Sequence, residues 1–238
     1  MLFITQGVTT VSQRQFVSFC FYKIDPSWRL RADDVRCADK HVFAEAVNQF
    51  ADDLLVRTYS TVGTRGDVDL LVWRATEDLD LLTKATAAIN HTALAPFLSS
   101  PHQYLAMTRH STYVTRHTHE GQDGTRTRIR PSDARYLVVY PFVKTRPWYA
   151  LDKEERQRMM NAHIQMGHKY PTVKINTTYS FGLDDQEFVV AFETDVLSDF
   201  LDLVMELRET EASSYTLRDT PTFTCQRMDL AEALDLVG

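Results

Sequence analysis

Two histidines lie on one predicted helix, and their type could serve metal or proton-transfer chemistry if either is buried. In the segment 151–170, His163 lies four residues from Met159 and three from Met160, on the apolar stripe. His168 is rotated from His163 by about 140° at 3.6 residues per turn, so we expect His163 to face the interior and His168 to face mostly solvent. A neutral imidazole is a common metal ligand. The alternative is a core histidine with satisfied hydrogen bonds, because nothing nearby has metal-ligand spacing.

A second pair of polar side chains belongs to a predicted strand. The run RYLVVYPF at 135–142 is rich in β-branched and aromatic residues, which is typical of a strand. Tyr140 and Lys144 have the same parity, so a regular strand projects both from one face, about 13 Å apart at most. A phenol can lose an electron and a proton together, and an ammonium can hold a carboxylate. The alternative is a core tyrosine beside a lysine whose stem packs and whose ammonium reaches solvent.

The elements that must position these side chains follow from the second half of the chain. Asp152 at the N-cap and Glu155 at N3 form a capping-box variant that starts the helix, and Pro171 ends it. A Gly/Asp turn at 182–186 joins two strands into a hairpin. The predicted elements are a strand at 135–142, a helix at 151–170, strands at 172–181 and 187–194, a helix from 196 and a strand at 221–225. Their order is βαββαβ.

The first half of the chain repeats this order. It predicts a strand at 15–24, a helix at 39–53, strands at 54–62 and 67–74, and a helix from about 77. The duplication indicates an α+β fold made of two ferredoxin-like units, each with one sheet face that needs cover. We expect the units to pack into a barrel-like arrangement. The expected division is a first unit at 1–110, a connecting loop at 111–134 and a second unit at 135–238.

The composition argues against several classes of function. The 238 residues carry a net charge of −6, which gives no basic surface for nucleic acid. The longest apolar runs are far short of the roughly 20 residues that cross a bilayer, and the N-terminus does not resemble a signal peptide, so we expect a cytoplasmic protein. Three widely spaced cysteines indicate neither a disulfide framework nor a zinc site. The arginine-rich segment 125–135 is either a solvated loop or a clamp for anionic groups.

Three segments resemble the chlorite dismutase superfamily, which also contains the coproheme decarboxylases. They are 140–163, 170–195 and 207–224, and they contain a Trp, a His fifteen residues later, and a Val-Lys strand that leads into a Gly-Leu-Asp-Asp hairpin. The first half resembles the less distinctive N-terminal half of the family. The resemblance implies an iron porphyrin, either coprohaem or haem b, and a homo-oligomer, which at this length is usually a pentamer.

The resemblance also implies roles around the porphyrin. His163 matches the axial iron ligand, a role for which imidazole is chemically suited. Glu211 falls near the carboxylate that accepts the other N–H of that ligand, and the alternative is a solvated carboxylate at a helix end. Trp148 matches a family position beside the porphyrin, and the alternative is an aromatic side chain that only packs.

Other positions separate the activities of the family. Chlorite dismutases carry an arginine where this chain has Ile175, and an isoleucine offers neither charge nor donors to an oxyanion. The connection from helix to strand is one residue shorter than in the arginine-bearing type, so the alternative is that Lys174 substitutes for the arginine. Strand alternation instead places Lys174 on the opposite face from Ile175. Tyr140 and Lys144 match the Y-P-x-x-K pattern of coproheme decarboxylases. That match implies a tyrosyl radical that takes hydrogen from a propionate, and a lysine that engages the carboxylate.

An apolar residue at position 175 resembles the decarboxylase branch in which a histidine of the connecting loop acts as base for hydrogen peroxide. His117 and His119 are the candidates, and ordinary exposed histidines are the alternative. The sequence therefore favours peroxide-dependent decarboxylation of coprohaem propionates to vinyl groups, which gives haem b. The alternatives are a chlorite dismutase and a non-catalytic haem-binding or haem-transfer protein.

Overall fold

The computed structural model describes residues 14–113 and 128–238. Its strands are β1 (Phe16–Ile24), β2 (Leu55–Ser60), β3 (Leu70–Thr76), β4 (Leu98–Met107), β5 (Tyr136–Lys144), β6 (Lys174–Tyr179), β7 (Phe188–Thr194), β8 (Thr216–Arg218) and β9 (Phe223–Arg227). Its α-helices are α1 (Asp33–Asn48), α2 (Leu79–Asn90), α3 (Arg146–Ala150), α4 (Lys153–Gly167), α5 (Leu197–Arg208) and α6 (Leu230–Asp235). Three short 3-10 helices are η1 (Pro26–Leu30), η2 (Ala95–Phe97) and η3 (Glu211–Tyr215). Within these ranges no helix is long and apolar enough to cross a membrane.

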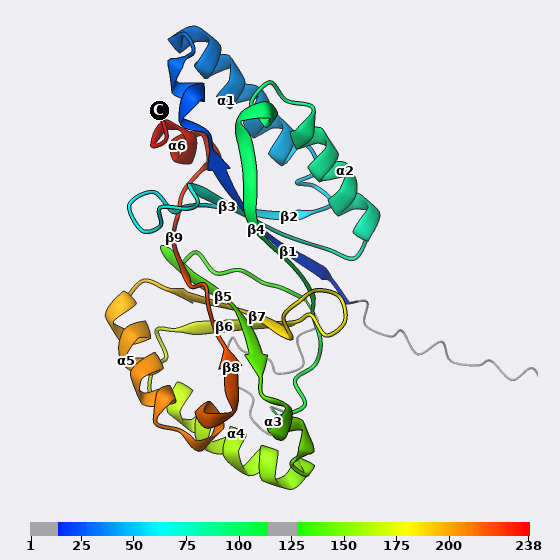
Figure 1. Ribbon diagram of the computed structural model, residues 1–238, viewed down its shortest axis with the longest axis vertical. Helices are drawn as coiled ribbons and strands as arrows, with labels where there is room; N and C mark the ends of the chain where they lie inside the picture. Colours follow the sequence, from blue (N-terminus) through cyan, green and yellow to red (C-terminus); the bar gives the residue numbers. More distant parts are fainter. Residues whose placement is uncertain (1–13, 114–127) are drawn as a thin grey trace, which may run out of the picture.

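The strands of each half form an antiparallel sheet, and the two sheets close into a barrel. The strand orders are β4-β1-β3-β2 and β6-β7-β5-β9. Tyr59 of β2 pairs with Arg227 of β9, and Met107 of β4 pairs with Tyr179 of β6, so both edges of the two sheets are joined. Figure 1 shows α1 and α2 outside one half and α4 and α5 outside the other. The predicted α+β fold, with duplicated ferredoxin-like units in a barrel-like arrangement, is confirmed.

The barrel interior is an apolar core shared by both halves. Phe19, Phe21 and Trp73 of the first half meet Leu137 and Phe223 of the second half, and all five are fully buried. The rings of Phe21 and Phe223 stack with 4.0 Å between their centroids. Since burial of one such side chain contributes about 1.5–3 kcal/mol, these contacts stabilise the closed barrel and hold the outer sheet faces in place.

Helices α1 and α6 cover part of the outer face of the first sheet. Phe43 and Val47 of α1 pack there, and Leu230 and Leu234 of α6 join the same buried cluster. Figure 1 shows that α6, at the C-terminus, lies beside α1 of the first half. The sequence did not predict α6, because its six residues are too few to display a helical period.

The first helix differs from its predicted bounds. The sequence predicts 39–53, whereas α1 begins at Asp33 and ends at Asn48. Asp33 and Asp34 occupy its first turn, where carboxylates interact favourably with the helix dipole. The residues that follow Asn48 form turns that lead into β2. The first turn of the helix is polar, so a prediction based on the spacing of apolar residues placed the start of the helix too late.

Candidate functional site

The outer face of the second sheet carries several of the predicted functional side chains. Tyr140 of β5 lies opposite Val190 of β7, which in turn lies opposite Thr177 of β6. Ile175 is two residues from Thr177, so its side chain shares this face. Lys144 has the parity of Tyr140, and its ammonium lies over the ring of Phe142 on the same face. The register therefore gathers side chains of β5, β6 and β7 that are far apart in the sequence.

Helix α5 covers part of this sheet face, and the part beside β6 is exposed. Phe200 and Leu203 of α5 pack in a cluster with Phe192 and Val190. Ile175, toward the β6 margin, is 44% exposed. Lys174 points to the opposite face and pairs with the buried Glu193 at 3.1 Å, as strand alternation predicts. The side chain of Ile175 is therefore exposed at the margin beside β6, and Lys174 does not supply a cation there.

The Tyr140 side chain is held by packing. Its ring stacks on Phe192 with 5.7 Å between the centroids. Burial is the main reason that the pKa of the Tyr140 phenol is raised above its ordinary value, with the charge of Asp219 adding to the effect. The phenol therefore keeps its proton at neutral pH.

His163 is partly buried on α4, whereas His168 is exposed at the end of the same helix, as the helical spacing predicts. Burial, together with the nearby Lys144 ammonium, lowers the pKa of His163 to about 4, so the imidazole is neutral at pH 7. The hydroxyl of Thr210 donates to the Leu207 carbonyl at 2.7 Å, which leaves its oxygen to accept from Nδ1–H of His163 at 3.4 Å. This tautomer directs the lone pair of Nε2 away from Thr210, where it can bind a metal.

Lys144 and Trp148 contact each other, and the Lys144 charge lies near enough to act on His163. The Lys144 ammonium donates to the carbonyl of Ala212 at 2.6 Å and lies 4.6 Å from the centre of the Trp148 ring. Burial lowers the pKa of Lys144 to about 8, an effect that the charge of Glu187 opposes. Trp148 is 3% exposed and packs against Tyr215. Both side chains are thus fixed by contacts within the second half.

The side chain of Glu211 points toward solvent rather than toward His163. Its carboxylate accepts from Arg158 at 2.8 Å and is 53% exposed, while the preceding residue, Thr210, contacts His163. In this structure Glu211 pairs with Arg158 and Thr210 contacts His163, so the role of Glu211 beside the porphyrin stays a prediction. The difference is rotational: Glu211 begins the 3-10 helix η3 with its side chain toward solvent, and Thr210 turns inward one residue earlier.

Two predicted histidines cannot be placed in the structure, and one contact residue was not predicted from the sequence. His117 and His119 lie outside the described residues, so their role stays a prediction. The sequence missed Glu187, whose carboxylate accepts the backbone N–H of Lys144 at 2.8 Å and the hydroxyl of Tyr149 at 2.5 Å. Its position near the start of β7, in a stretch of ordinary strand composition, gave no signal of this double contact.

Comparisons with known proteins agree with this architecture. The chlorite dismutase family model matches residues 36–228. The coproheme decarboxylase of Mycolicibacterium smegmatis is 31% identical over 173 residues, which is 72% of this chain and 72% of that protein. The structure of chlorite dismutase from Candidatus Nitrospira defluvii in complex with imidazole matches with a TM-score of 0.83 and 26% identity, over 94% of this chain and 95% of that chain.

A variant of the same Nitrospira enzyme matches with a TM-score of 0.84 at 26% identity, over 94% of this chain and 96% of that chain. The family model covers most of the sequence and includes every strand from β2 to β9. This chain therefore belongs to the chlorite dismutase family.

Proposed function

We propose that this chain catalyses the peroxide-dependent oxidative decarboxylation of coprohaem propionates to vinyl groups, giving haem b. The observation that carries the proposal is the shared sheet face of Tyr140 and Lys144, with the uncharged Ile175 at its open margin. The relative from Mycolicibacterium smegmatis, named a coproheme decarboxylase, supports the same reaction.

The residues present fit an iron porphyrin. His163 offers a neutral imidazole whose Nδ1 is engaged by Thr210 and whose Nε2 has no hydrogen-bond partner among the described residues. Ile175 supplies apolar surface, and Lys144 supplies a cation for a carboxylate. His163 would hold the iron through Nε2. When bound, the iron porphyrin supplies the oxidising capacity that it draws from hydrogen peroxide.

The protein side chains would direct that oxidation to the propionates. Tyr140, which burial keeps protonated, would first give up an electron and a proton to the oxidised porphyrin. The phenoxyl radical left on Tyr140 would then take a hydrogen atom from the propionate β-carbon, which restores the phenol. Lys144 holds the carboxylate until the carbon–carbon bond to it breaks. For each propionic acid group, one hydrogen peroxide is reduced to two waters while the group becomes a vinyl and carbon dioxide. His117 and His119 are the proposed bases that accept the peroxide proton.

Mass spectrometry of the porphyrin tests the proposal. The intact protein is loaded with iron coproporphyrin, hydrogen peroxide is added stepwise, and the porphyrin is extracted and weighed. We expect successive losses of carbon dioxide with two hydrogens, and a product that matches haem b. A porphyrin that stays bound with its propionates unchanged would leave a haem-binding or haem-transfer protein as the function.

Chlorite is expected to be a poor substrate. The position that carries arginine in chlorite dismutases is occupied by Ile175, which has no donor, and Lys174 is turned toward Glu193. Loss of a charge-assisted hydrogen bond to an oxyanion lowers catalysis by about 100-fold or more. An oxygen electrode checks this on haem-loaded protein. Rapid and sustained oxygen evolution would favour the chlorite dismutase alternative.

The pKa of Lys144 predicts a pH dependence. The side chain carries its charge below a pKa of about 8 and loses it above, so kcat/KM for coprohaem should fall as the pH rises through 8. Lys144→Arg keeps its charge to higher pH, so the decline should move upward by more than about one pH unit. Rates measured between about pH 6 and pH 10 check this. An identical decline in Lys144→Arg would exclude Lys144 as its source.

Thr210, rather than Glu211, is expected to tune the ligand His163. Thr210→Val removes the oxygen that accepts from Nδ1–H at 3.4 Å, so porphyrin affinity should fall by about 10-fold. Glu211→Gln changes a side chain that pairs with Arg158, so affinity should stay within about 2-fold. Absorbance titration with haem compares the two variants. A larger loss in Glu211→Gln would restore the role that the alignment implied.

A further inference from the structure

A cavity of about 580 Å³ lies where the two halves of the chain join, apart from the sheet face around Tyr140. The end of α1, strand β2, the segment before β5, the end of β9 and the start of α6 line it. Part of its wall is apolar, from Ala44, Val56 and Leu230. Its size falls in the range of small-molecule sites. The proposed decarboxylation uses none of its lining residues.

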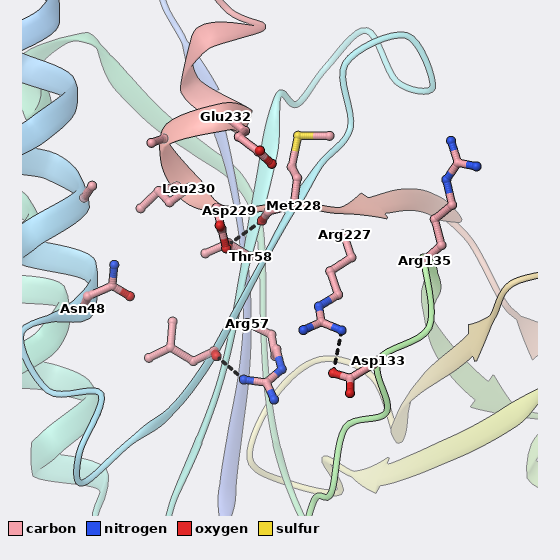
Figure 2. Close-up of a pocket in the computed structure, with 13 residues that line it drawn as sticks. Asn48, Arg57, Thr58, Asp133, Arg135, Arg227, Met228, Asp229, Leu230 and Glu232 are labelled. Carbon is pink, nitrogen blue, oxygen red and sulfur yellow. Dashed lines mark hydrogen bonds and ion pairs between the residues drawn. The ribbon is translucent and has the colours of Figure 1, made fainter.

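Two arginines from different halves reach into this cavity. Tyr59 of β2 lies directly opposite Arg227 of β9, and Arg57 is two residues from Tyr59 on the same strand face. Arg57 and Arg227 are therefore diagonal cross-strand neighbours, a spacing of about 7–8 Å that long side chains span. Figure 2 shows both guanidinium groups in the lower part of the cavity, with Asp133 next to Arg227.

Three arginines and three carboxylates line the cavity, but the carboxylates are placed unevenly around Arg57 and Arg227. Arg227 pairs with Asp133 at 2.7 Å, but the Asp133 carboxylate is 90% exposed, so solvent weakens the pair. Asp229 and Glu232 also line the cavity and lie on its α6 side, away from the guanidinium groups in Figure 2. Arg57 makes no ion pair with a carboxylate in the described part of the chain.

Arg57 carries the clearest sign of a missing acceptor. Its Nη1 donates to the Val56 carbonyl at 3.2 Å, and its Nε is buried without a hydrogen-bond partner among residues 14–113 and 128–238. A buried donor without an acceptor destabilises a fold, and a cationic donor does so more strongly. Buried donors in native proteins nearly always have an acceptor, so an ordered water or an added anion would complete the contacts of this guanidinium.

We propose that Arg57 and Arg227 form a binding site for a small organic anion that carries a carboxylate or a phosphate. Two oxygens on one planar or tetrahedral group match the parallel donors of a guanidinium, and a second arginine adds charge without a new desolvation step. The ligand oxygens would accept from Arg57 and Arg227. Val56 precedes Arg57 on β2 and points to the opposite strand face, so the two guanidinium groups, rather than the apolar wall, would hold the ligand.

Calorimetric titration of the intact protein tests this site. Inorganic phosphate and succinate are the two probes, used separately in a buffer without other multivalent anions. We expect saturable binding of one probe per chain, and the tighter probe identifies the acid group that the site prefers. Arg57→Met and Arg227→Met should each weaken that binding by about 10-fold or more, the loss expected for a charge-assisted hydrogen bond.

Arg135→Met is the matched control. Arg135 also lines the cavity, but its guanidinium lies 5.1 Å from the centre of the Tyr136 ring and points away from Arg57 in Figure 2. This variant should bind the probe within about 2-fold of the native protein. Circular dichroism confirms folding, and if one arginine variant does not fold the other decides. Unchanged affinity in the folded variants, an equal loss in Arg135→Met, or no binding of either probe to the native protein would overturn the proposal.

Discussion

Replacing His163 by alanine is expected to lower the affinity for iron porphyrin by more than about 100-fold, since His163 is the residue that would hold the iron. His163 is the neutral imidazole whose Nδ1 is engaged by Thr210, and alanine offers no ligand atom. Absorbance of the Soret band during reconstitution measures the loss. Imidazole added to the His163→Ala protein should recover part of the band, because the small molecule can occupy the space that the side chain vacates.

His168→Ala is the control for this result. His168 is exposed at the end of α4, five residues further along, and its backbone N–H bonds to the Ile164 carbonyl whichever side chain is present. Its replacement should therefore leave the Soret band and the affinity nearly unchanged. If instead His168→Ala lost the band and His163→Ala kept it, the assignment of the iron ligand to His163 would be wrong.

The orientation of the two histidines was predictable because it depends on one local period. His163 and Met159 are four residues apart on α4, and a helix with a capping residue at Asp152 fixes their common face regardless of the rest of the fold. Strand parity is equally local, so the opposite faces of Lys174 and Ile175 also followed from the sequence. The repeated order of elements then gave the fold class.

Contacts that depend on tertiary placement were not predictable in the same way. The residue that contacts His163 is Thr210, one position before the predicted Glu211. Spacing patterns cannot predict the position of a residue between two helices to within one residue. Glu187 lies just before β7 and contacts Lys144 of β5 and Tyr149 of α3. Glu187 is about 40 positions from both residues in the sequence, so no helical or strand period predicts the contacts. The pairing of Tyr59 with Arg227 closes the barrel between residues far apart in sequence, so the cavity around Arg57 was also hidden.

Tyr140→Phe is expected to leave porphyrin binding intact and to stop decarboxylation. Phenylalanine keeps the ring that stacks on Phe192, so stability should change by only about 0.5–1.5 kcal/mol, the contribution of one hydrogen bond. Porphyrin affinity should stay near the native value because His163 is untouched. The variant lacks the hydroxyl that relays hydrogen, so the rate of carbon dioxide loss should fall by about 100-fold or more, as on removal of a proton-transfer group.

Two other tyrosines provide matched controls for this result. Tyr149 donates its hydroxyl to Glu187, and Tyr179 packs on Phe188 at the far end of the same sheet face. Tyr149→Phe and Tyr179→Phe should each retain decarboxylation, because neither hydroxyl has the proposed position beside the propionate. Mass spectrometry of extracted porphyrin after equal additions of peroxide compares the three variants. If Tyr140→Phe bound coprohaem and decarboxylated it at close to the native rate, the hydrogen transfer would belong to whichever control variant had lost it, and Tyr140 would be a packing residue.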